Sequence, residues 1–170
     1  MKKIVALAAV VLLVISAVVY TSMGMTKKNN SDTKETVQSH LAIKDITKFE
    51  KYIKLIGLSK KELISTLGEE PTTIDEGGLE FTKTGIRVWF KDYGAGAVQQ
   101  VYTDKKDVVF NGVKLGDKIS SFKNVFGNPV KENTSSAFSN FEYKDIVLSV
   151  YYDAKTQITF AAYVLDPAVK

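Results

Sequence analysis

The side chains that most often perform catalysis are scarce in this chain. His40 is the only histidine, and cysteine is absent. A Ser-His-Asp arrangement needs a histidine within hydrogen-bond reach of a serine and an acid. His40 lies instead in a polar stretch that we interpret as a tether, away from any folded acid or nucleophile. We therefore expect a protein that is not an enzyme and has no catalytic residues.

One acidic cluster could in principle bind a hard cation through carboxylate oxygens. It lacks the alternating spacing and the central glycine of a calcium-binding EF-hand loop, so a charged loop between a helix and a strand is the better interpretation. The glycines Gly94 and Gly96 lie between two strand patterns, whereas a phosphate-binding loop precedes a helix. We expect no metal site and no cofactor. The cluster consists of Glu69, Glu70, Asp75 and Glu76.

The aromatic residues of the predicted strands are the best functional lead. In residues 86–90, Ile86, Val88 and Phe90 alternate with Arg87 and Trp89, so the two sets point to opposite faces. Trp, Tyr and Arg often carry the binding energy of protein interfaces. Aromatic residues also favour strands and pair across them, so pure sheet stabilisation is the alternative. The candidate binding face consists of Arg87, Trp89, Gln99, Ser149, Tyr151 and Tyr163, with Val101 and Thr159 on the same side.

These strands belong to a pattern that the second half of the chain presents twice. Gly57, Leu63 and Gly68 recur at one constant spacing, and Phe81 and Ile86 recur at a spacing one residue longer. Their counterparts are Gly116, Phe122, Gly127, Phe141 and Ile146. A repeat of this kind indicates two copies of one supersecondary unit, neither of which can bury its apolar face alone.

Each copy begins with a helix that has clear start and stop signals. Ser59 and Glu62 have the spacing of a capping box, in which each side chain satisfies a backbone amide of the other. Asp117 is the expected cap of the second helix. Gly68 and Gly127 are expected to end the two helices at positive φ.

Strand-like alternation follows each helix, at residues 86–90 and 98–102 in the first copy and at 146–150 and 158–162 in the second. In the last segment, Ile158, Phe160, Ala162 and Val164 are expected to point inward. We therefore predict an α+β fold in which two tandem repeats of a helix and an antiparallel meander form one curved sheet, with the helices packed on one face.

The N-terminus is expected to direct export. Lys2 and Lys3 precede an apolar run at residues 4–20, which fits a signal peptide and is at the short limit of a membrane span, about 17–25 residues. Residues 1–24 are thus a cleaved signal or a retained membrane anchor, and both place the rest outside the cytoplasm. Residues 25–44 are polar and are expected to form a flexible tether. Residues 45–170 form the predicted domain, with repeats at about 45–104 and 105–166.

The amino-acid composition limits the classes of partner that we expect. The formal net charge is +4, and Arg87 is the only arginine. Because lysine lacks the planar fork that binds phosphate bidentately, and no dense basic stretch is present, we do not expect nucleic acid as a partner. The absence of cysteine excludes disulfides, so the domain must be stabilised by its core. We expect a monomer.

The chain resembles a known family in its helix stops. Residues 110–117 with 126–129, and residues 55–62 with 67–71, are similar to the tandem-repeat fold of the β-lactamase inhibitor protein and its single-repeat relatives, the SmpA/OmlA lipoproteins. The first copy also resembles uncharacterised exported proteins of Gram-positive bacteria. The resemblance covers residues 54–165 and implies a concave sheet face that binds protein. Because the inhibitor's cysteine pairs are absent, β-lactamase inhibition does not carry over.

These observations together predict a non-enzymatic extracytoplasmic module, secreted or tethered to the membrane, that binds an unidentified protein through the exposed sheet face. Two alternatives stay open. One is a module that binds cell-wall carbohydrate or a small ligand, with Trp89 and Tyr151 as a stacking platform. The other is an inhibitor of a secreted hydrolase, which rests on the resemblance alone.

Overall fold

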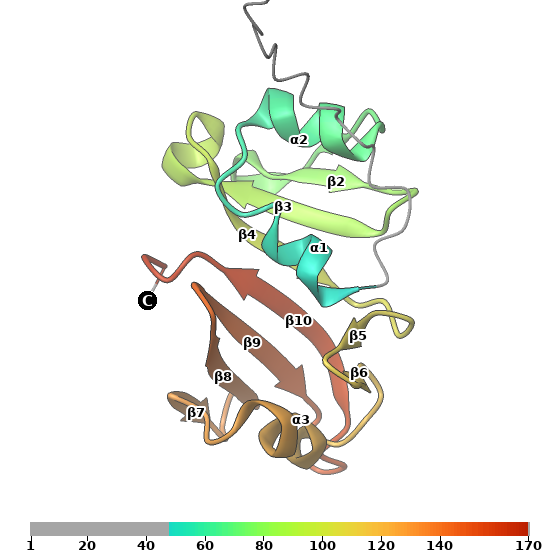
Figure 1. Ribbon diagram of the computed structural model, residues 1–170, viewed down its shortest axis with the longest axis vertical. Coiled ribbons are helices and arrows are strands. Elements are labelled where there is room, and N and C mark those ends of the chain that lie inside the picture. The colour runs from blue at the N-terminus through green and yellow to red at the C-terminus, as the bar shows by residue number, and fades with distance from the viewer. Residues whose placement is uncertain (1–47, 170) are drawn as a thin grey trace, which may run out of the picture. The chain divides into compact units, whose positions relative to one another are not determined.

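The computed structural model of the protein describes residues 48–169, which form an α+β fold with a large antiparallel sheet (Figure 1). The sheet has eight strands in the order β1-β2-β3-β4-β10-β9-β8-β7, and β5 and β6 form a separate hairpin. The helices are α1 (Phe49–Ile53), α2 (Lys60–Leu67) and α3 (Ile119–Phe126). The strands are β1 (Thr72–Thr73), β2 (Leu79–Phe81), β3 (Ile86–Phe90), β4 (Val98–Thr103), β5 (Val109–Phe110), β6 (Val113–Lys114), β7 (Lys131–Asn133), β8 (Phe138–Tyr143), β9 (Ile146–Tyr152) and β10 (Thr159–Leu165).

Helix α2 begins and ends as its sequence predicts. The Ser59 side chain accepts the Glu62 amide, and Glu62 accepts the Ser59 amide at 2.9 Å, which completes the capping box. Gly68 ends the helix in the left-handed conformation at φ 61° and ψ 31°. The start and the stop of this helix are therefore both local properties of the sequence.

Helix α3 differs from its prediction at its first turn. Lys118 is the N-cap and provides no side-chain cap, so the expected role of Asp117 is wrong. The Asp117 carboxylate instead accepts the Lys114 amide at 2.9 Å, which closes the turn before the helix. The C-terminal prediction is confirmed, because Gly127 lies at φ 84°.

Gly127→Ala should lower the free energy of unfolding by about 1 kcal/mol or more, and by more than Gly68→Ala. Gly127 has φ 84° and ψ −162°, a region that only glycine adopts readily, whereas Gly68 is left-handed helical. Apart from the adjoining residues of the chain, no heavy atom lies within 4 Å of a Cβ built at either glycine, so both costs come from the backbone conformation. Denaturant unfolding of the two variants measures them, and an unchanged midpoint for Gly127→Ala would remove this account of the helix stop.

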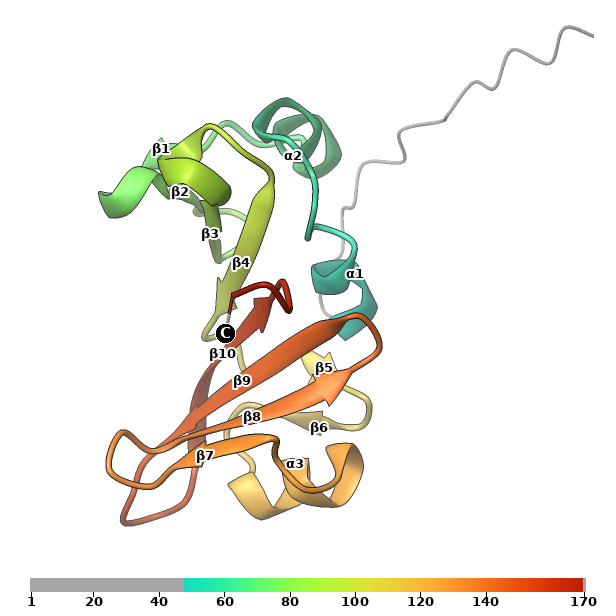
Figure 2. The same cartoon turned by 90° about the vertical axis from the view of Figure 1, so that its left-hand side faces the viewer.

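The sheet joins two sets of strands along one seam. Strands β1 to β4 follow one another, strands β7 to β10 do the same, and β4 pairs with β10 between them. Tyr102 lies opposite Tyr163 and Val101 lies opposite Val164 across this seam. Figure 2 shows the paired strands β4 and β10 from a second direction. Side chains of residues far apart in the sequence thus become neighbours on one sheet.

Two bulges correct the predicted strand phases. The register between β3 and β4 shifts between Trp89 and Phe90, so Val101 points inward and is buried rather than lying on the candidate binding face. A second shift lies between Thr159 and Ala161 in β10. It leaves Ile158 and Phe160 exposed, at 36% and 54%, and buries Thr159, against the prediction for all three.

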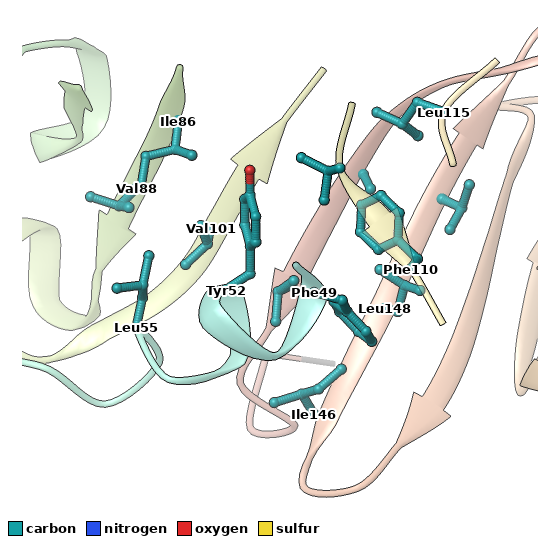
Figure 3. Packing of buried hydrophobic residues seen from close by; sticks show 14 of the residues in the cluster. Phe49, Tyr52, Leu55, Ile86, Val88, Val101, Phe110, Leu115, Ile146 and Leu148 are labelled. Atoms are coloured by element: carbon teal, nitrogen blue, oxygen red, sulfur yellow. The ribbon is translucent and has the colours of Figure 1, made fainter. Parts of the chain in front are cut away.

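The core is a single cluster of buried hydrophobic residues, to which all three helices contribute. Phe49 of α1 is fully buried, with its ring centroid 5.2 Å from that of Phe110 and 5.4 Å from that of Tyr143. Figure 3 shows Phe49 and Tyr52 projecting from α1 among strand residues that include Val101 and Leu148. Helix α1, although only five residues long, is thus fixed by its buried rings.

Tyr52 should make stability depend on alkaline pH. Burial raises the pKa of its phenol to about 12 from 10.0, and nearby Asp107 and Asp104 act in the same direction. The stabilisation is therefore fully present below pH 10 and is lost as pH rises from about 10 to 12, by up to about 3 kcal/mol. Urea unfolding between pH 9 and 11.5 should show a steeper decline for the natural chain than for Tyr52→Phe. Equal slopes would contradict the prediction.

The predicted N-terminal segments, residues 1–24 and 25–44, lie outside the described residues, as does His40. Within residues 48–169, no helix is long and apolar enough to cross a membrane.

Candidate functional site

The side of the sheet opposite the buried strand residues is built from cross-strand rows. In β3, Ile86, Val88 and Phe90 are buried, while Arg87 is exposed and Trp89 is partly exposed. Residues directly opposite one another on antiparallel strands share a face. One row of such pairs therefore crosses most of the sheet: Glu80, Arg87, Tyr102, Tyr163, Ser149, Asn140 and Lys131.

The aromatic side chains of this face form a continuous chain of ring contacts. Tyr163 lies at its centre, with ring centroids 6.2 Å from Trp89, 5.0 Å from Tyr102 and 5.6 Å from Tyr151. Tyr151 in turn lies 5.6 Å from Phe138. All of these residues are partly exposed. We call this set, Trp89, Tyr102, Tyr163, Tyr151 and Phe138, the aromatic row.

The structure brings most of the predicted face residues together. Trp89, Tyr151 and Tyr163 belong to the aromatic row, and Arg87 lies beside Tyr102. Ser149 has the expected orientation, opposite Tyr163, but it is buried. Gln99 lies at the β3–β4 bulge and lines a hollow with Trp89 rather than pairing across the strands.

Five residues of this face are absent from the sequence prediction: Glu80, Tyr102, Lys131, Phe138 and Asn140. Tyr102 was missed because the bulge at Gln99 reverses the phase of β4 after Val98. Phe138 and Asn140 carry a usable signal, because alternation from the buried Phe141 places both on the opposite side.

Arg87 is held in place by two neighbours. Its Nε donates to the Glu80 carboxylate at 2.8 Å, and its guanidinium carbon lies 5.4 Å from the centre of the Tyr102 ring. The hydrogen bond to Glu80 raises the pKa of Arg87, and burial raises the pKa values of Tyr102 and Tyr163. The guanidinium is therefore charged and the phenols neutral at ordinary pH.

A hollow of about 430 Å³ lies at the Phe138 end of the aromatic row. Val130, Val147 and Leu165 give it aliphatic walls, beside the rings of Phe138 and Tyr151. Asn140 also lines it, and its Oδ1 atom is buried with no hydrogen-bond partner in the structure. A buried acceptor of this kind favours a ligand that brings an N–H or O–H donor. We call this space the Asn140 hollow.

A second hollow lies at the opposite end of the row. It has a volume of about 440 Å³ and is lined by Ile74, Asp75, Glu76, Glu80, Arg87, Trp89 and Tyr163. The Trp89 indole and the Ile74 side chain both pack closely against Gly78, since a Cβ built on Gly78 would lie 2.8 Å from the indole Nε1 and 2.9 Å from the Ile74 side chain. The absence of a side chain at Gly78 therefore leaves the space that the Trp89 indole occupies. We call this space the Trp89 hollow.

The acidic cluster of the sequence analysis divides in the structure. Glu69 is buried, and its carboxylate accepts the backbone amides of Lys83 at 2.6 Å and Thr84 at 3.0 Å. Glu70, Asp75 and Glu76 are exposed. Across the part of the chain that the structure describes, no group of three or more potential ligands could hold a metal ion. Glu69 therefore organises the turn between β2 and β3.

Comparison with known proteins identifies a solved structure with a similar fold but indicates no function. No family model matches the sequence, and no curated protein matches it. An extracellular protein containing an SCP domain from Bacillus anthracis has a similar structure, with a TM-score of 0.52, 12% identity, and 85% of this chain and 50% of that chain covered. A cysteine-rich secretory protein from Staphylococcus aureus aligns with a TM-score of 0.47, 16% identity, and coverage of 68% and 46%. This chain spans about half the length of either protein.

The comparison corrects the family resemblance. The fold is similar to about half of an extracellular protein that contains an SCP domain, so the resemblance to the β-lactamase inhibitor protein and the SmpA/OmlA lipoproteins is wrong. The motifs behind that resemblance are helix stops and core positions, which many folds share. Inhibition of a secreted hydrolase rested on that resemblance alone, and it has no other support.

Proposed function

We propose that this protein is a non-enzymatic extracytoplasmic module that binds another protein through the aromatic row. The observation that carries the proposal is the row itself, a chain of partly exposed Trp, Tyr and Phe rings across neighbouring strands. Such residues bury large areas at little cost in side-chain entropy, and Trp and Tyr are enriched among the residues that dominate interface energies.

The two hollows at the ends of the row support the same function. The Asn140 hollow combines aliphatic walls with an unpartnered acceptor, which suits an apolar side chain next to an amide or hydroxyl donor. A protein segment offers both groups within one residue. The row and its hollows together can therefore contact several residues of one partner.

Carbohydrate binding is the alternative, and the ring geometry favours it less. Trp89 and Tyr151 both pack against Tyr163, at interplanar angles of 37° and 59°. The rings therefore do not share one plane on which a sugar could stack across the row. A single ring remains able to stack on a sugar, so the two functions need an experimental comparison.

The proposal treats the two sets of strands as tandem copies of one unit, with the helices on the face opposite the row. Gly68 and Gly127 end corresponding helices at positive φ, and Leu63 of α2 and Phe122 of α3 belong to the same buried cluster. On this view each copy contributes to the row: Trp89 and Tyr102 from the first, and Phe138, Tyr151 and Tyr163 from the second.

Export of the protein is part of the proposal. It is supported by the basic and apolar N-terminal sequence and by the extracellular nature of the B. anthracis protein with a similar fold. Retention of residues 1–24 would tether the module to the membrane, and cleavage would release it.

Photo-crosslinking in living cells tests the function. A photoreactive phenylalanine analogue at Trp89 should link the full chain to a protein of the cell envelope. The same analogue at Val125, an exposed residue of α3 outside the row, is the matched control and should not form this product. Crosslinking to a protein from both positions, or from neither, would contradict binding through the row. Retention of the chain on cell-wall sugar without a crosslinked protein would favour the carbohydrate alternative.

A further inference from the structure

The Trp89 end of the face carries an excess of negative charge. Two adjoining hollows share Trp89 and Glu76, and together they are lined by the carboxylates Asp75, Glu76, Glu80 and Asp92. Arg87 is the one basic residue in their linings, and it is already paired with Glu80. Because the whole chain has a formal net charge of +4, this end of the face differs in sign from the chain as a whole.

The remaining carboxylates are available to a partner. Asp75, Glu76 and Asp92 are exposed, and among residues 48–169 none of their side chains makes a hydrogen bond or an ion pair. They lie on the short turns after β1 and β3, which approach one another closely: a Cβ built on Gly77 would be 2.5 Å from the Tyr93 carbonyl oxygen. Their positions are thus fixed by the backbone, next to the indole.

We propose that the protein partner presents lysine or arginine side chains to the Trp89 hollow. This inference rests on the proposed function and specifies its partner as a basic protein segment. A cation over an indole face is attracted by the ring, and neighbouring carboxylates attract it further. The molecule already contains one such arrangement, since Arg87 lies over the Tyr102 ring at 5.4 Å while it pairs with Glu80.

The Asn140 hollow defines the other end of the same partner. It is lined by one lysine and one glutamate, Lys131 and Glu142, and its walls are mainly aliphatic and aromatic. A segment that crosses the row should therefore be basic at the Trp89 end and apolar at the Asn140 end. Charge complementarity at one end only would also fix the direction in which the segment lies.

Trp89 provides its own assay, because it is the only tryptophan in the chain. The probes are hexalysine, hexalysine with all side chains acetylated, and hexaglutamate, each titrated into the full chain at low ionic strength. Hexalysine should change the Trp89 fluorescence saturably, with at least about tenfold weaker binding at 0.5 M salt. The acetylated and glutamate peptides should bind at least tenfold more weakly than hexalysine.

A double variant that removes two charges with little change in side-chain size tests the role of charge. Asp75→Asn with Glu76→Gln should weaken hexalysine binding by about tenfold or more. The matched control, Asp145→Asn with Glu50→Gln, changes two exposed carboxylates outside the row and its hollows and should leave hexalysine binding within twofold. Equal binding of acetylated hexalysine, an unchanged affinity of the double variant, or no fluorescence response to hexalysine would each overturn the inference. If one of these results is obtained and position 89 still crosslinks to a protein, the proposed protein binding is retained. Only the basic character of the partner segment is then contradicted.

Discussion

Phe122→Ala is expected to lower the free energy of unfolding by about 3–5 kcal/mol, enough to unfold much of a small domain at physiological temperature. Phe122 is fully buried in α3, and its ring centroid lies 5.8 Å from that of Phe110 and 6.3 Å from that of Phe126. Truncation removes these contacts and leaves a cavity between the helix and the β5–β6 hairpin. Thermal and urea unfolding followed by circular dichroism measure the loss.

Trp89→Ala is the matched control, because it truncates a still larger aromatic residue. Trp89 is partly exposed on the opposite side of β3 from Val88, so this change should cost far less stability than Phe122→Ala. A Trp89→Ala variant that unfolds as readily as Phe122→Ala would show that the indole belongs to the core. The aromatic row would then lose its function as a binding surface.

Glu69→Ala should be the second most damaging substitution, with a loss of about 2–4 kcal/mol. The buried Glu69 carboxylate accepts two backbone amides, from Lys83 and Thr84, in the turn between β2 and β3. Alanine removes the acceptor of both part-buried hydrogen bonds, and a hydrogen bond to a charged group contributes about 1.5–3 kcal/mol.

The neighbouring Glu70 provides the comparison. Glu70 is exposed, so Glu70→Ala removes a carboxylate of the same charge and should change stability by less than about 0.5 kcal/mol. Urea unfolding of both variants at neutral pH separates the effect of the two hydrogen bonds from the loss of charge. A Glu69→Ala variant as stable as Glu70→Ala would show that the turn does not need the carboxylate.

Much of the fold could be predicted from the sequence, because the relevant signals are local. The capping box of Ser59 and Glu62, the stops at Gly68 and Gly127, and the alternation in residues 86–90 all describe interactions within a few residues. The α+β class and the large antiparallel sheet follow from these elements. The export signal and the tether, in contrast, lie outside the described residues and stay predictions.

The strand faces could be predicted only up to the bulges. A bulge inserts one residue and reverses the phase of everything after it. Alternation alone therefore placed Val101 outward and Phe160 inward, whereas Val101 is buried and Phe160 is 54% exposed. The pairing that defines the bulge is made with another strand, so no local pattern shows it.

The candidate site could be predicted in part for the same reason. Trp89 and Tyr151 lie on the strands opposite the bulges, which gain no extra residue, and Tyr163 lies beyond the bulge in β10, so their shared face is as expected. The contact between Trp89 and Tyr163 depends on the β4–β10 seam, which joins segments about half the domain apart in sequence. The role of Glu69 likewise depends on the turn at Lys83 and Thr84, which follows strands β1 and β2 in the sequence. No local pattern links Glu69 to this turn, so the sequence predicts only a charged loop.

The affinity of the crosslinked partner for Trp89→Ala tests the central claim, protein binding through the aromatic row, most directly. Isothermal titration of the purified partner into the full chain should show binding that is weaker by about 2 kcal/mol or more, roughly thirtyfold, for Trp89→Ala. The control Val125→Ala should bind as the natural chain does. Equal affinities for the natural chain and Trp89→Ala, with both folded, would contradict the account.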